Sequence, residues 1–389
     1  MTEIPQGRET REPDGTVSDD RDGQRIRRRT ALCCLGTTAV VGLSGCASLL
    51  PSGDAAGERT ITDVVGRTVD LPEYADRIVC VGGGTLRQIA YMKAADRVVG
   101  VENIPEQALD EIPYLLANPG LGELPIVGES GMDRDGNVEQ ILEVDPDVIF
   151  FNGDSSRADE LRQRTNTPVV VIGVDSILEE SGRELLYDTW ETLGQTLRKE
   201  DRTAELQRFL GEVVSDLNDR TDDISAAERK SAYAGAFRFG GAHGLSTTRG
   251  DTTMFRFSNV DNAIDELEVD QPSVALGHER LLEEDPETIF VDVMSSERVR
   301  GEIDENPELG SLTAVEQGRV YTVLPVYRDM RNFGSILSNA YYVGMTLYPD
   351  RFVDVDIESR TDDIFETLLN APLYERINQE FPDVFRPLL

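Results

Sequence analysis

The sequence of 389 residues predicts an α/β protein of two Rossmann-like lobes, each built on a parallel sheet and joined by a long backbone helix. Two lobes fit the length, because one hydrophobic core rarely serves more than about 250–300 residues. Three patterns support this prediction. A helix–turn–strand segment occurs twice, short apolar runs alternate with helical segments in both halves, and a helical stretch separates the halves.

The repeated segment is "NVEQILEVDPDVIFF" at 137–151 and "GHERLLEEDPETIFV" at 277–291. In each copy an amphipathic pattern runs up to an Asp-Pro pair, and a short apolar, β-rich run follows. Proline disfavours helical backbone in the residue before it. We therefore expect helices to end near Val144 and Glu284, with a buried strand beginning two residues after each Asp-Pro pair.

Other short apolar runs predict further strands, which alternate with helical segments as parallel α/β sheets require. They are RIVCV (77–81), RVVGV (97–101), PVVVIGV (168–174), SAYAGAF (231–237) and GRVYTV (318–323). Between the halves, residues 178–224 carry apolar side chains at helical spacing with few glycines or prolines. This stretch predicts a stiff helical spine that permits only small rocking of the lobes.

The first 46 residues resemble a twin-arginine export signal that ends in a lipobox. Arg28 and Arg29 precede an uncharged apolar stretch, which stops at "LSGC" with Cys46. The alternative is a chance hydrophobic stretch in a tail. The resemblance implies export by the twin-arginine route and a lipidated Cys46 that holds the protein on the extracellular face of the cell membrane. The expected boundaries are a signal at 1–46, a flexible tether at 47–59, an N-terminal lobe at 60–177, the spine at 178–224 and a C-terminal lobe at 225–389.

The charge of the chain is strongly negative, at −35. Residues 1–45 hold seven arginines and seven acidic residues, so the whole excess lies in the remainder. Such an excess repels itself at low ionic strength, but at molar salt the Debye length falls to about 3 Å. The composition therefore indicates a halophilic protein of archaeal type and excludes nucleic acid as a partner. Beyond the expected anchor Cys46, the globular part holds only Cys80, which is expected to be a small buried core residue.

The order of motifs carries a family resemblance. After the lipobox come TITDVVGRTVDLPEYADRIVCVGG (60–83), the first repeat copy, the long helix, the second copy and NPELGSLTAVEQGRVYTV (306–323). This order resembles the substrate-binding proteins with a helical backbone that serve ABC importers of iron–siderophore complexes, haem and cobalamin. FGGAHGLSTTRGD (239–251) and NAYYVGMTLYPDRFVDVD (339–356) resemble the subgroup that binds iron complexes. The resemblance covers about residues 60–385.

The resemblance implies that one glutamate at the tip of each lobe engages the two permease subunits, which work with ATPase subunits. Glu139 and Glu279 occupy the matching positions of the two repeat copies. Two like charges held apart by a rigid spine suit a partner of roughly two-fold symmetry with complementary charge. The alternative is that each is only a first-turn glutamate favoured by the helix dipole.

The ligand is expected in the cleft between the lobes, outside the carboxyl ends of the strands. Gly83, Gly84 and Thr85 end the first predicted strand and open a helix, so they could offer backbone N–H groups and a hydroxyl to an anionic group. A plain tight turn is the alternative. Arginines at predicted cleft loops suggest an anionic ligand, unless they only pair with surface acids. These arginines are Arg238, Arg249, Arg328 and Arg331.

If the ligand carries a metal ion, two further residues become candidates for binding it. His243 and Tyr327 could complete the coordination of ferric iron, although a lone loop histidine is more often a hydrogen-bonding residue. The sequence therefore favours a monomeric receptor, without cofactor or catalysis, for an iron(III) chelate of siderophore type. The alternatives are the same receptor role for cobalamin or for molybdate or tungstate, and an extracellular enzyme on the same fold, which no catalytic motif supports.

Overall fold

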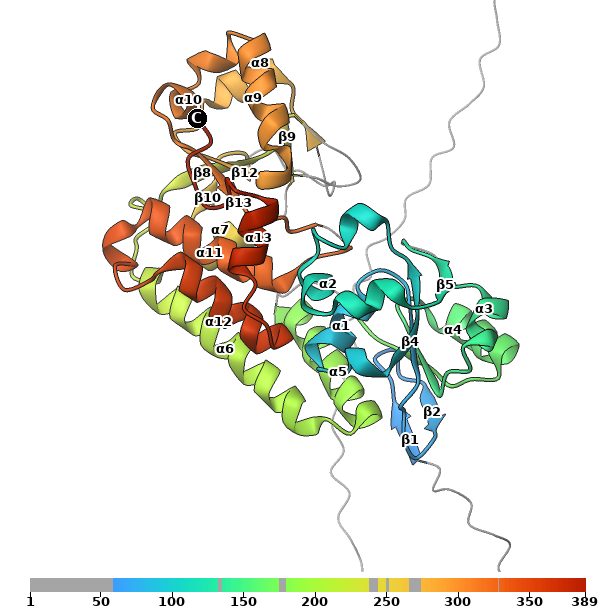
Figure 1. Cartoon of the computed structure of the whole chain (residues 1–389). Coiled ribbons are helices and arrows are strands. Elements are labelled where there is room, and N and C mark those ends of the chain that lie inside the picture. Colours follow the sequence, from blue (N-terminus) through green and yellow to red (C-terminus); the bar gives the residue numbers. More distant parts are fainter. Residues whose placement is uncertain are drawn as a thin grey trace, which may run out of the picture. The chain divides into compact units, whose positions relative to one another are not determined.

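The computed structural model describes residues 59–131, 135–174, 180–237, 244–249, 252–265, 274–327 and 329–389 (Figure 1). All of them belong to one compact unit, residues 53–389. The expected signal, tether and lipidation site, including Arg28, Arg29 and Cys46, lie outside the described residues. Among the described residues, no helix is long and apolar enough to cross a membrane.

The N-terminal lobe is built on a parallel sheet in the order β5-β4-β3-β6-β7. Its strands are β3 (Ile78–Val81), β4 (Val98–Asn103), β5 (Ile126–Glu129), β6 (Val148–Phe151) and β7 (Val169–Val171). Its helices are α1 (Thr85–Tyr91), α2 (Pro113–Ala117), α3 (Val138–Glu143) and α4 (Ser155–Thr165). An antiparallel hairpin of β1 (Arg59–Thr62) and β2 (Thr68–Leu71) precedes the sheet.

The C-terminal lobe has a mixed sheet in the order β11-β9-β8-β12-β13, with β10 beside β8. Strands β8, β12 and β13 pair in parallel, whereas β9 pairs antiparallel with β8 and β11. The strands are β8 (Ser231–Gly235), β9 (Thr247–Thr248), β10 (Asp261–Asn262), β11 (Val274–Ala275), β12 (Ile289–Asp292) and β13 (Val320–Val323). The helices are α7 (Thr253–Phe257), α8 (His278–Glu284), α9 (Ser296–Glu305), α10 (Thr313–Glu316), α11 (Phe333–Leu347), α12 (Ile357–Leu369) and α13 (Tyr374–Glu380).

The two repeat copies adopt the same local structure, as the sequence predicts. Helix α3 leads into β6, and helix α8 leads into β12, with the helices ending beside Val144 and at Glu284. The next residue is left-handed in both copies, with φ of 43° at Asp145 and 36° at Asp285. Aspartate tolerates this conformation better than most residues, and the proline that follows prevents the helix from continuing.

Each sheet sends alternate side chains to opposite faces, as strands must. In β3, Val79 and Val81 join an outer apolar cluster with α3 and α4, whereas Ile78 and Cys80 join a central one. In β12, Phe290 belongs to that same central cluster, while its neighbours pack under α8, α9 and α10 on the other face (Figure 1). The central cluster also takes in α5, α6, α11 and α12. The two lobes therefore share one continuous core.

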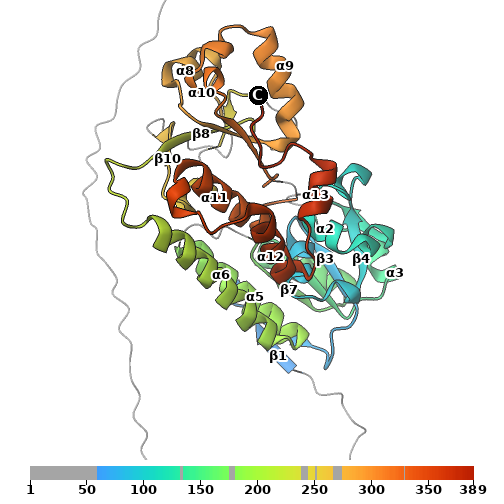
Figure 2. The same ribbon diagram turned by 60° about the vertical axis from the view of Figure 1, so that its left-hand side comes forward.

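The helical stretch between the lobes is broken, so the prediction of one unbroken helix over 178–224 was wrong in this detail. It forms α5 (Glu180–Leu197) and α6 (Glu200–Thr221), which run side by side (Figure 2). Arg198 has a φ of 56°, and the next amide, Lys199 N, donates to Gly194 O at 2.8 Å. The chain thus turns back on itself, and α6 is the helix that reaches the second lobe. The two-lobed α/β fold with a connecting helix is confirmed.

Arg202 of α6 ties parts of both lobes together. Its side chain is only 7% exposed. Nε donates to Tyr91 O at the end of α1, at 2.8 Å, and Nη2 donates to Thr367 O of α12, at 2.7 Å. Because charged donors make the stronger hydrogen bonds, this residue stiffens the junction. The shared core and this contact agree with the expectation of small lobe movements.

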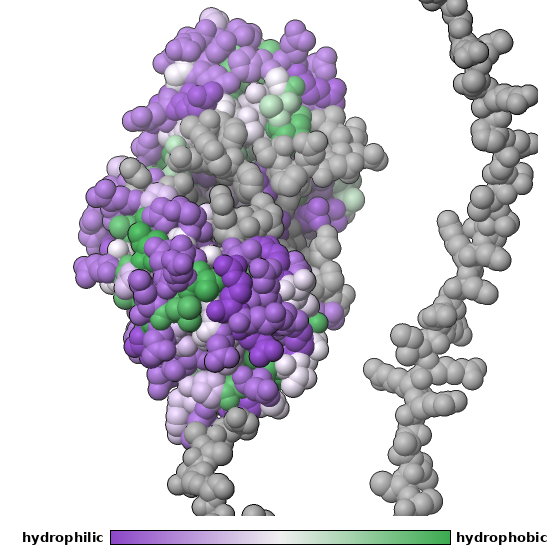
Figure 3. All heavy atoms as spheres, turned by 90° about the vertical axis from the view of Figure 1, so that its right-hand side faces the viewer, coloured by the Kyte–Doolittle hydropathy of each residue, from purple (hydrophilic) through white to green (hydrophobic). Residues whose placement is uncertain are grey.

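Most acidic side chains of the described residues lie at the surface, since the buried ones are Asp63, Glu102 and Asp292. The face in Figure 3 is largely hydrophilic, and hydrophobic residues form only small scattered spots on it. The strongly exposed large hydrophobic side chains belong to separate elements, as Tyr74, Ile126 and Val353 illustrate. Isolated apolar residues of this kind are normal on protein surfaces and do not by themselves mark an interface.

Candidate functional site

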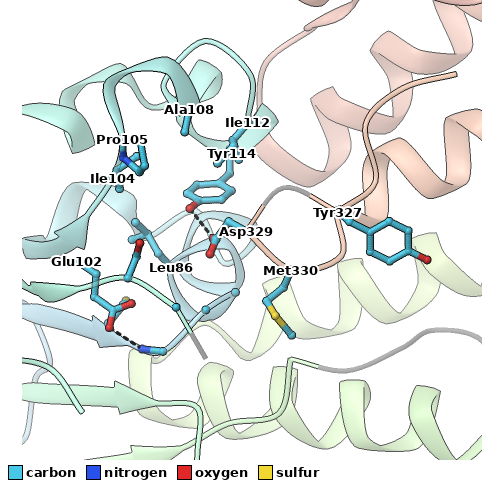
Figure 4. A pocket seen from close by; sticks show the side chains of 16 residues that line it. Leu86, Glu102, Ile104, Pro105, Ala108, Ile112, Tyr114, Tyr327, Asp329 and Met330 are labelled. Atoms are coloured by element: carbon cyan, nitrogen blue, oxygen red, sulfur yellow. Dashed lines mark hydrogen bonds between the residues drawn. The ribbon is translucent and has the colours of Figure 1, made fainter. Parts of the chain in front are cut away.

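A cavity of about 400 Å³ lies at the carboxyl ends of β3 and β4, where a loop of the C-terminal lobe approaches them. This is the edge of a parallel sheet at which α/β proteins bind their ligands. Most of its wall is apolar, and its polar side chains include Glu102, Tyr114, Ser130 and Asp329 (Figure 4). It is lined by Cys80, Gly82, Gly83, Gly84, Leu86, Glu102, Ile104, Pro105, Ala108, Ile112, Tyr114, Ser130, Gly131, Tyr327, Asp329 and Met330.

The glycine turn between β3 and α1 forms one wall. Gly82 and Gly84 have φ of 91° and 80°, a left-handed backbone that glycine adopts without steric penalty. Thr85 does not line the cavity. Its hydroxyl donates to Gly82 O at 2.6 Å, inside the turn, and its amide donates to the same oxygen at 3.2 Å. The turn therefore presents its glycine backbone to the cavity, while its threonine hydroxyl serves the turn itself.

Glu102 stands at the end of β4 and is only 9% exposed. Its Oε1 accepts a hydrogen bond from Gly82 N at 3.1 Å. Burial raises the pKa of this carboxyl group to about 7; the Gly82 amide opposes the shift and the nearby Asp329 adds to it. The group is therefore divided between its neutral and charged forms near neutral pH.

Asp329 comes from the other lobe and makes the second polar contact at the wall. Tyr114 Oη donates to its Oδ2 at 2.7 Å (Figure 4). Burial and the neighbouring carboxylate raise the pKa of Tyr114 well above its usual value, so the phenol stays protonated and acts as a donor. A hydrogen bond between the lobes thus forms part of the cavity wall.

The loop that carries Asp329 is tight and packs closely on the glycine turn. Tyr327 and Arg331 pair across its base in an antiparallel bridge, which leaves Asp329 and Met330 at the tip. Both tip residues are left-handed, with φ of 52° and 63°. A Cβ placed on Gly83 would lie 3.2 Å from Met330 Cγ, so any larger residue there would make this contact tight.

The structure brings together only part of the predicted ligand site. Gly83, Gly84 and Tyr327 line the cavity, although the Tyr327 ring points away from Glu102 and Tyr114 (Figure 4). Arg249 is buried behind it, with its guanidinium carbon 3.7 Å from the centre of the Tyr327 ring, and Arg331 stays at the base of the loop. The remaining candidates, Arg238, His243 and Arg328, lie outside the described residues. Iron coordination by His243 and Tyr327 stays a prediction.

Sequence reasoning does not single out Glu102, Tyr114 and Asp329 of the wall, nor Arg87 behind it. Glu102 had a usable signal, because a carboxylate directly follows the apolar run RVVGV, at the carboxyl end of a predicted parallel strand. Tyr114 and Asp329 had none, since their meeting depends on how the two lobes pack. Within the described ranges, no cluster of three or more His, Cys, Asp or Glu side chains could hold a metal ion.

The two glutamates of the repeat stand at matching, exposed positions. Glu139 is the second residue of α3, and Glu279 is the second residue of α8. Each lies in a first turn where a negative charge is favoured by the helix dipole. Their placement is compatible with both readings of these residues, so the docking role stays a prediction.

Comparison with known proteins identifies the family. A family model described as "Periplasmic binding protein" matches residues 78–327, more than half of the chain. The chain belongs to the periplasmic binding protein family. The molybdate-binding protein MolA of Haemophilus influenzae is 24% identical over 338 residues, which cover 81% of this chain and 92% of MolA.

Solved structures of the family share the fold. MolA bound to molybdate matches with a TM-score of 0.64 at 20% identity, covering 81% of this chain and 99% of MolA. A periplasmic solute-binding protein of Veillonella parvula matches with a TM-score of 0.68 at 16% identity, covering 84% and 97%. CeuE of Helicobacter pylori with Ni(II) bound matches with a TM-score of 0.56 at 16% identity, covering 83% and 100%.

These comparisons define the role in general terms. The chain is a solute-binding protein of an ABC importer, and its family and relatives are substrate-binding proteins of such transporters, not enzymes. Proteins of this family work in the periplasm or outside the cell, where they present their solute to a permease.

Proposed function

We propose that the protein captures an iron(III) chelate of siderophore type in the cavity between its lobes and delivers it to an ABC permease. The observation that carries this proposal is the cavity itself, about 400 Å³ in volume with a mainly apolar wall. Sites for small organic ligands and cofactors typically have volumes of about 300–1,000 Å³ and apolar walls with a few polar groups. A chelator wraps the metal in organic surface and so matches such a wall.

A bare oxyanion fits the described wall less well. A water molecule occupies roughly 30 Å³ in the liquid, and a tetrahedral oxyanion is only a few times larger, so it would leave much of the cavity unfilled. It would also meet the carboxyl groups of Glu102 and Asp329, which repel a negative charge when they are ionised. A chelate can place apolar or hydrogen-bonding surface against the same groups.

Molybdate is the second candidate, because MolA of Haemophilus influenzae is described as molybdate-binding. The identity of 24% supports a shared fold and role more than a shared solute. Cobalamin is the third candidate, and the single tryptophan of the chain, Trp190, is buried in α5 away from the cavity wall.

We further propose that the receptor is a monomeric lipoprotein of a halophile. Export through Arg28 and Arg29 and lipidation at Cys46 would hold it at the membrane, and the net charge of −35 supports a life at high salt. Glu139 and Glu279 would then engage the permease dimer with its ATPase subunits, because they are exposed at matching places in the two lobes.

Ligand titration at molar salt tests the cargo. Trp190 is a built-in reporter, because its Nε1 donates to Gln88 Oε1 of α1 at 2.9 Å, and α1 begins at the glycine turn of the cavity. Its fluorescence would be followed while a ferric trihydroxamate, ferric citrate, cobalamin or molybdate is added. Saturable binding of an iron chelate at micromolar or lower concentration is expected. If the protein binds cobalamin or molybdate but no iron chelate, the proposed cargo is wrong and the bound compound takes its place.

A further inference from the structure

Arg87 of α1 is a fully buried cation with an incomplete set of partners. Its side chain has 0% exposure. Nη1 donates to Asp329 O at 2.9 Å, whereas Nε and Nη2 are buried without a hydrogen-bond partner. Its guanidinium carbon lies 5.1 Å from the centre of the Phe333 ring, and no described carboxylate forms an ion pair with it. Buried polar groups are normally satisfied, so two unused donors on a buried charge require an explanation.

The guanidinium lies directly behind the wall of the cavity. A Cβ placed on Gly84 would be 3.0 Å from Arg87 Nη2 and 3.3 Å from Met330 Cβ. Gly84 and Met330 both line the cavity. Among the described residues, the glycine backbone, Val174 and Met330 lie next to the unused donors, and Gly84 and Met330 face the space in which a ligand would bind.

Two oxygen atoms of Asp329 accept hydrogen bonds from two residues of the N-terminal lobe. Its backbone oxygen accepts from Arg87, and its Oδ2 accepts from Tyr114. A carboxylate or another anionic oxygen group of a ligand offers the same kind of acceptor. The loop holds this position with left-handed backbone at both Asp329 and Met330. Aspartate tolerates this conformation, but methionine does so poorly, so the backbone of Met330 opposes the contact.

We propose that Arg87 and Tyr114 form a subsite for an anionic oxygen of the cargo, and that Asp329 occupies this subsite as an internal competitor. The proposal rests on the cavity being the ligand site. A ligand that displaces the loop tip would gain the Arg87 fork and the Tyr114 hydroxyl together. The matching chemistry is a carboxylate, hydroxamate or phenolate oxygen on a chelate, or an oxygen of a free oxyanion.

Binding by purified variants tests the subsite, with ferric citrate as the anionic chelate and molybdate as the free oxyanion. Arg87→Gln should weaken binding of the anionic probe by about ten- to hundred-fold, because charged hydrogen bonds are lost. Asp329→Gly removes the Oδ2 that accepts from Tyr114 but keeps the backbone oxygen that accepts from Arg87, so by freeing the Tyr114 hydroxyl it should strengthen binding by up to about ten-fold. Asp145→Gly is the matched control, since Asp145 is also a left-handed aspartate but is exposed and does not line the cavity.

Tyr114→Phe separates a binding role from a purely structural one. If Tyr114 donates to the ligand, its loss weakens binding; if it only holds the loop, its loss frees Asp329 and strengthens binding, which would overturn the subsite. Unchanged affinity in Arg87→Gln and Asp329→Gly would overturn it as well. Should the wild-type protein bind no iron chelate, the proposed cargo fails alone. Molybdate binding gained by Asp329→Gly would then still support the subsite, and no binding of either anionic probe would reject it.

Discussion

Glu102 links the cavity wall to the stability of the fold. Its folded pKa of about 7 lies above the ordinary value of 4.5, because burial disfavours the charged carboxylate. A raised pKa means that the folded protein holds a proton that the unfolded chain has released. The stability associated with this group is therefore complete below about pH 4.5 and is lost as the pH rises towards 7.

Replacing Glu102 with glutamine should abolish this fall in folding stability at rising pH. Glutamine keeps an oxygen acceptor for Gly82 N but carries no charge. At about pH 8 the variant should be more stable than the wild type by on the order of 3 kcal/mol, and at about pH 4.5 the two should be similar. Thermal unfolding at molar salt across this pH range measures the difference. Parallel stability curves for the two proteins would mean that Glu102 titrates normally in the fold.

The packing of α5 against α6 depends on a single glycine. A Cβ placed on Gly194 would lie 2.2 Å from Thr203 Oγ1, and Thr203 donates from that oxygen to Trp190 O at 2.7 Å. The two helices could not approach as closely with any larger residue at this position. The contact sets how α6 leaves the N-terminal lobe, and therefore where the second lobe begins.

Gly194→Ala should destabilise the protein by about 1–3 kcal/mol, because the added methyl group overpacks this contact. Gly211→Ala is the matched control. Gly211 is an exposed glycine inside α6, and a Cβ there would meet nothing within 4 Å. Alanine at that site should stabilise the helix by about 0.5–1 kcal/mol. Chemical denaturation of both variants checks the opposite signs, and equal effects would show that packing at Gly194 is not the cause.

The pseudo-symmetric glutamates concern the molecule as a whole, because the proposal needs both lobes at once. The double variant Glu139→Ala with Glu279→Ala should bind ligand with wild-type affinity and fail to support uptake. Glu143→Ala with Glu283→Ala is the control, since these glutamates are exposed on the same two helices, one turn further on. Ligand titration and a cellular uptake assay measure the two properties separately. Normal uptake by the first variant would leave the two glutamates with only their effect on helix stability.

Features that depend on neighbouring residues could be predicted from the sequence, whereas features that depend on residues far apart in the chain could not. The repeat was readable because Asp-Pro and the apolar runs act on neighbouring residues, and both copies fold as predicted. The turn at Arg198 was missed, since no glycine or proline stands at the turn, and its left-handed backbone comes with a hydrogen bond from Lys199 N to Gly194 O that the sequence does not signal. The glycine wall could be predicted, whereas Tyr114 and Asp329 lie 215 positions apart and meet only in the folded chain.

Arg202 and the shared core also limit how far the two lobes can move when a ligand binds, and therefore which changes a permease could detect. Its side chain bonds to α1 and α12 together, so the distance between Glu139 and Glu279 should stay nearly constant whether or not a ligand is bound. A permease that contacts both glutamates would then meet them at the same distance in the free and the ligand-bound state. Ligand binding would then have to be signalled by a smaller, local conformational change. The left-handed loop tip at Asp329 and Met330 is placed to undergo such a change.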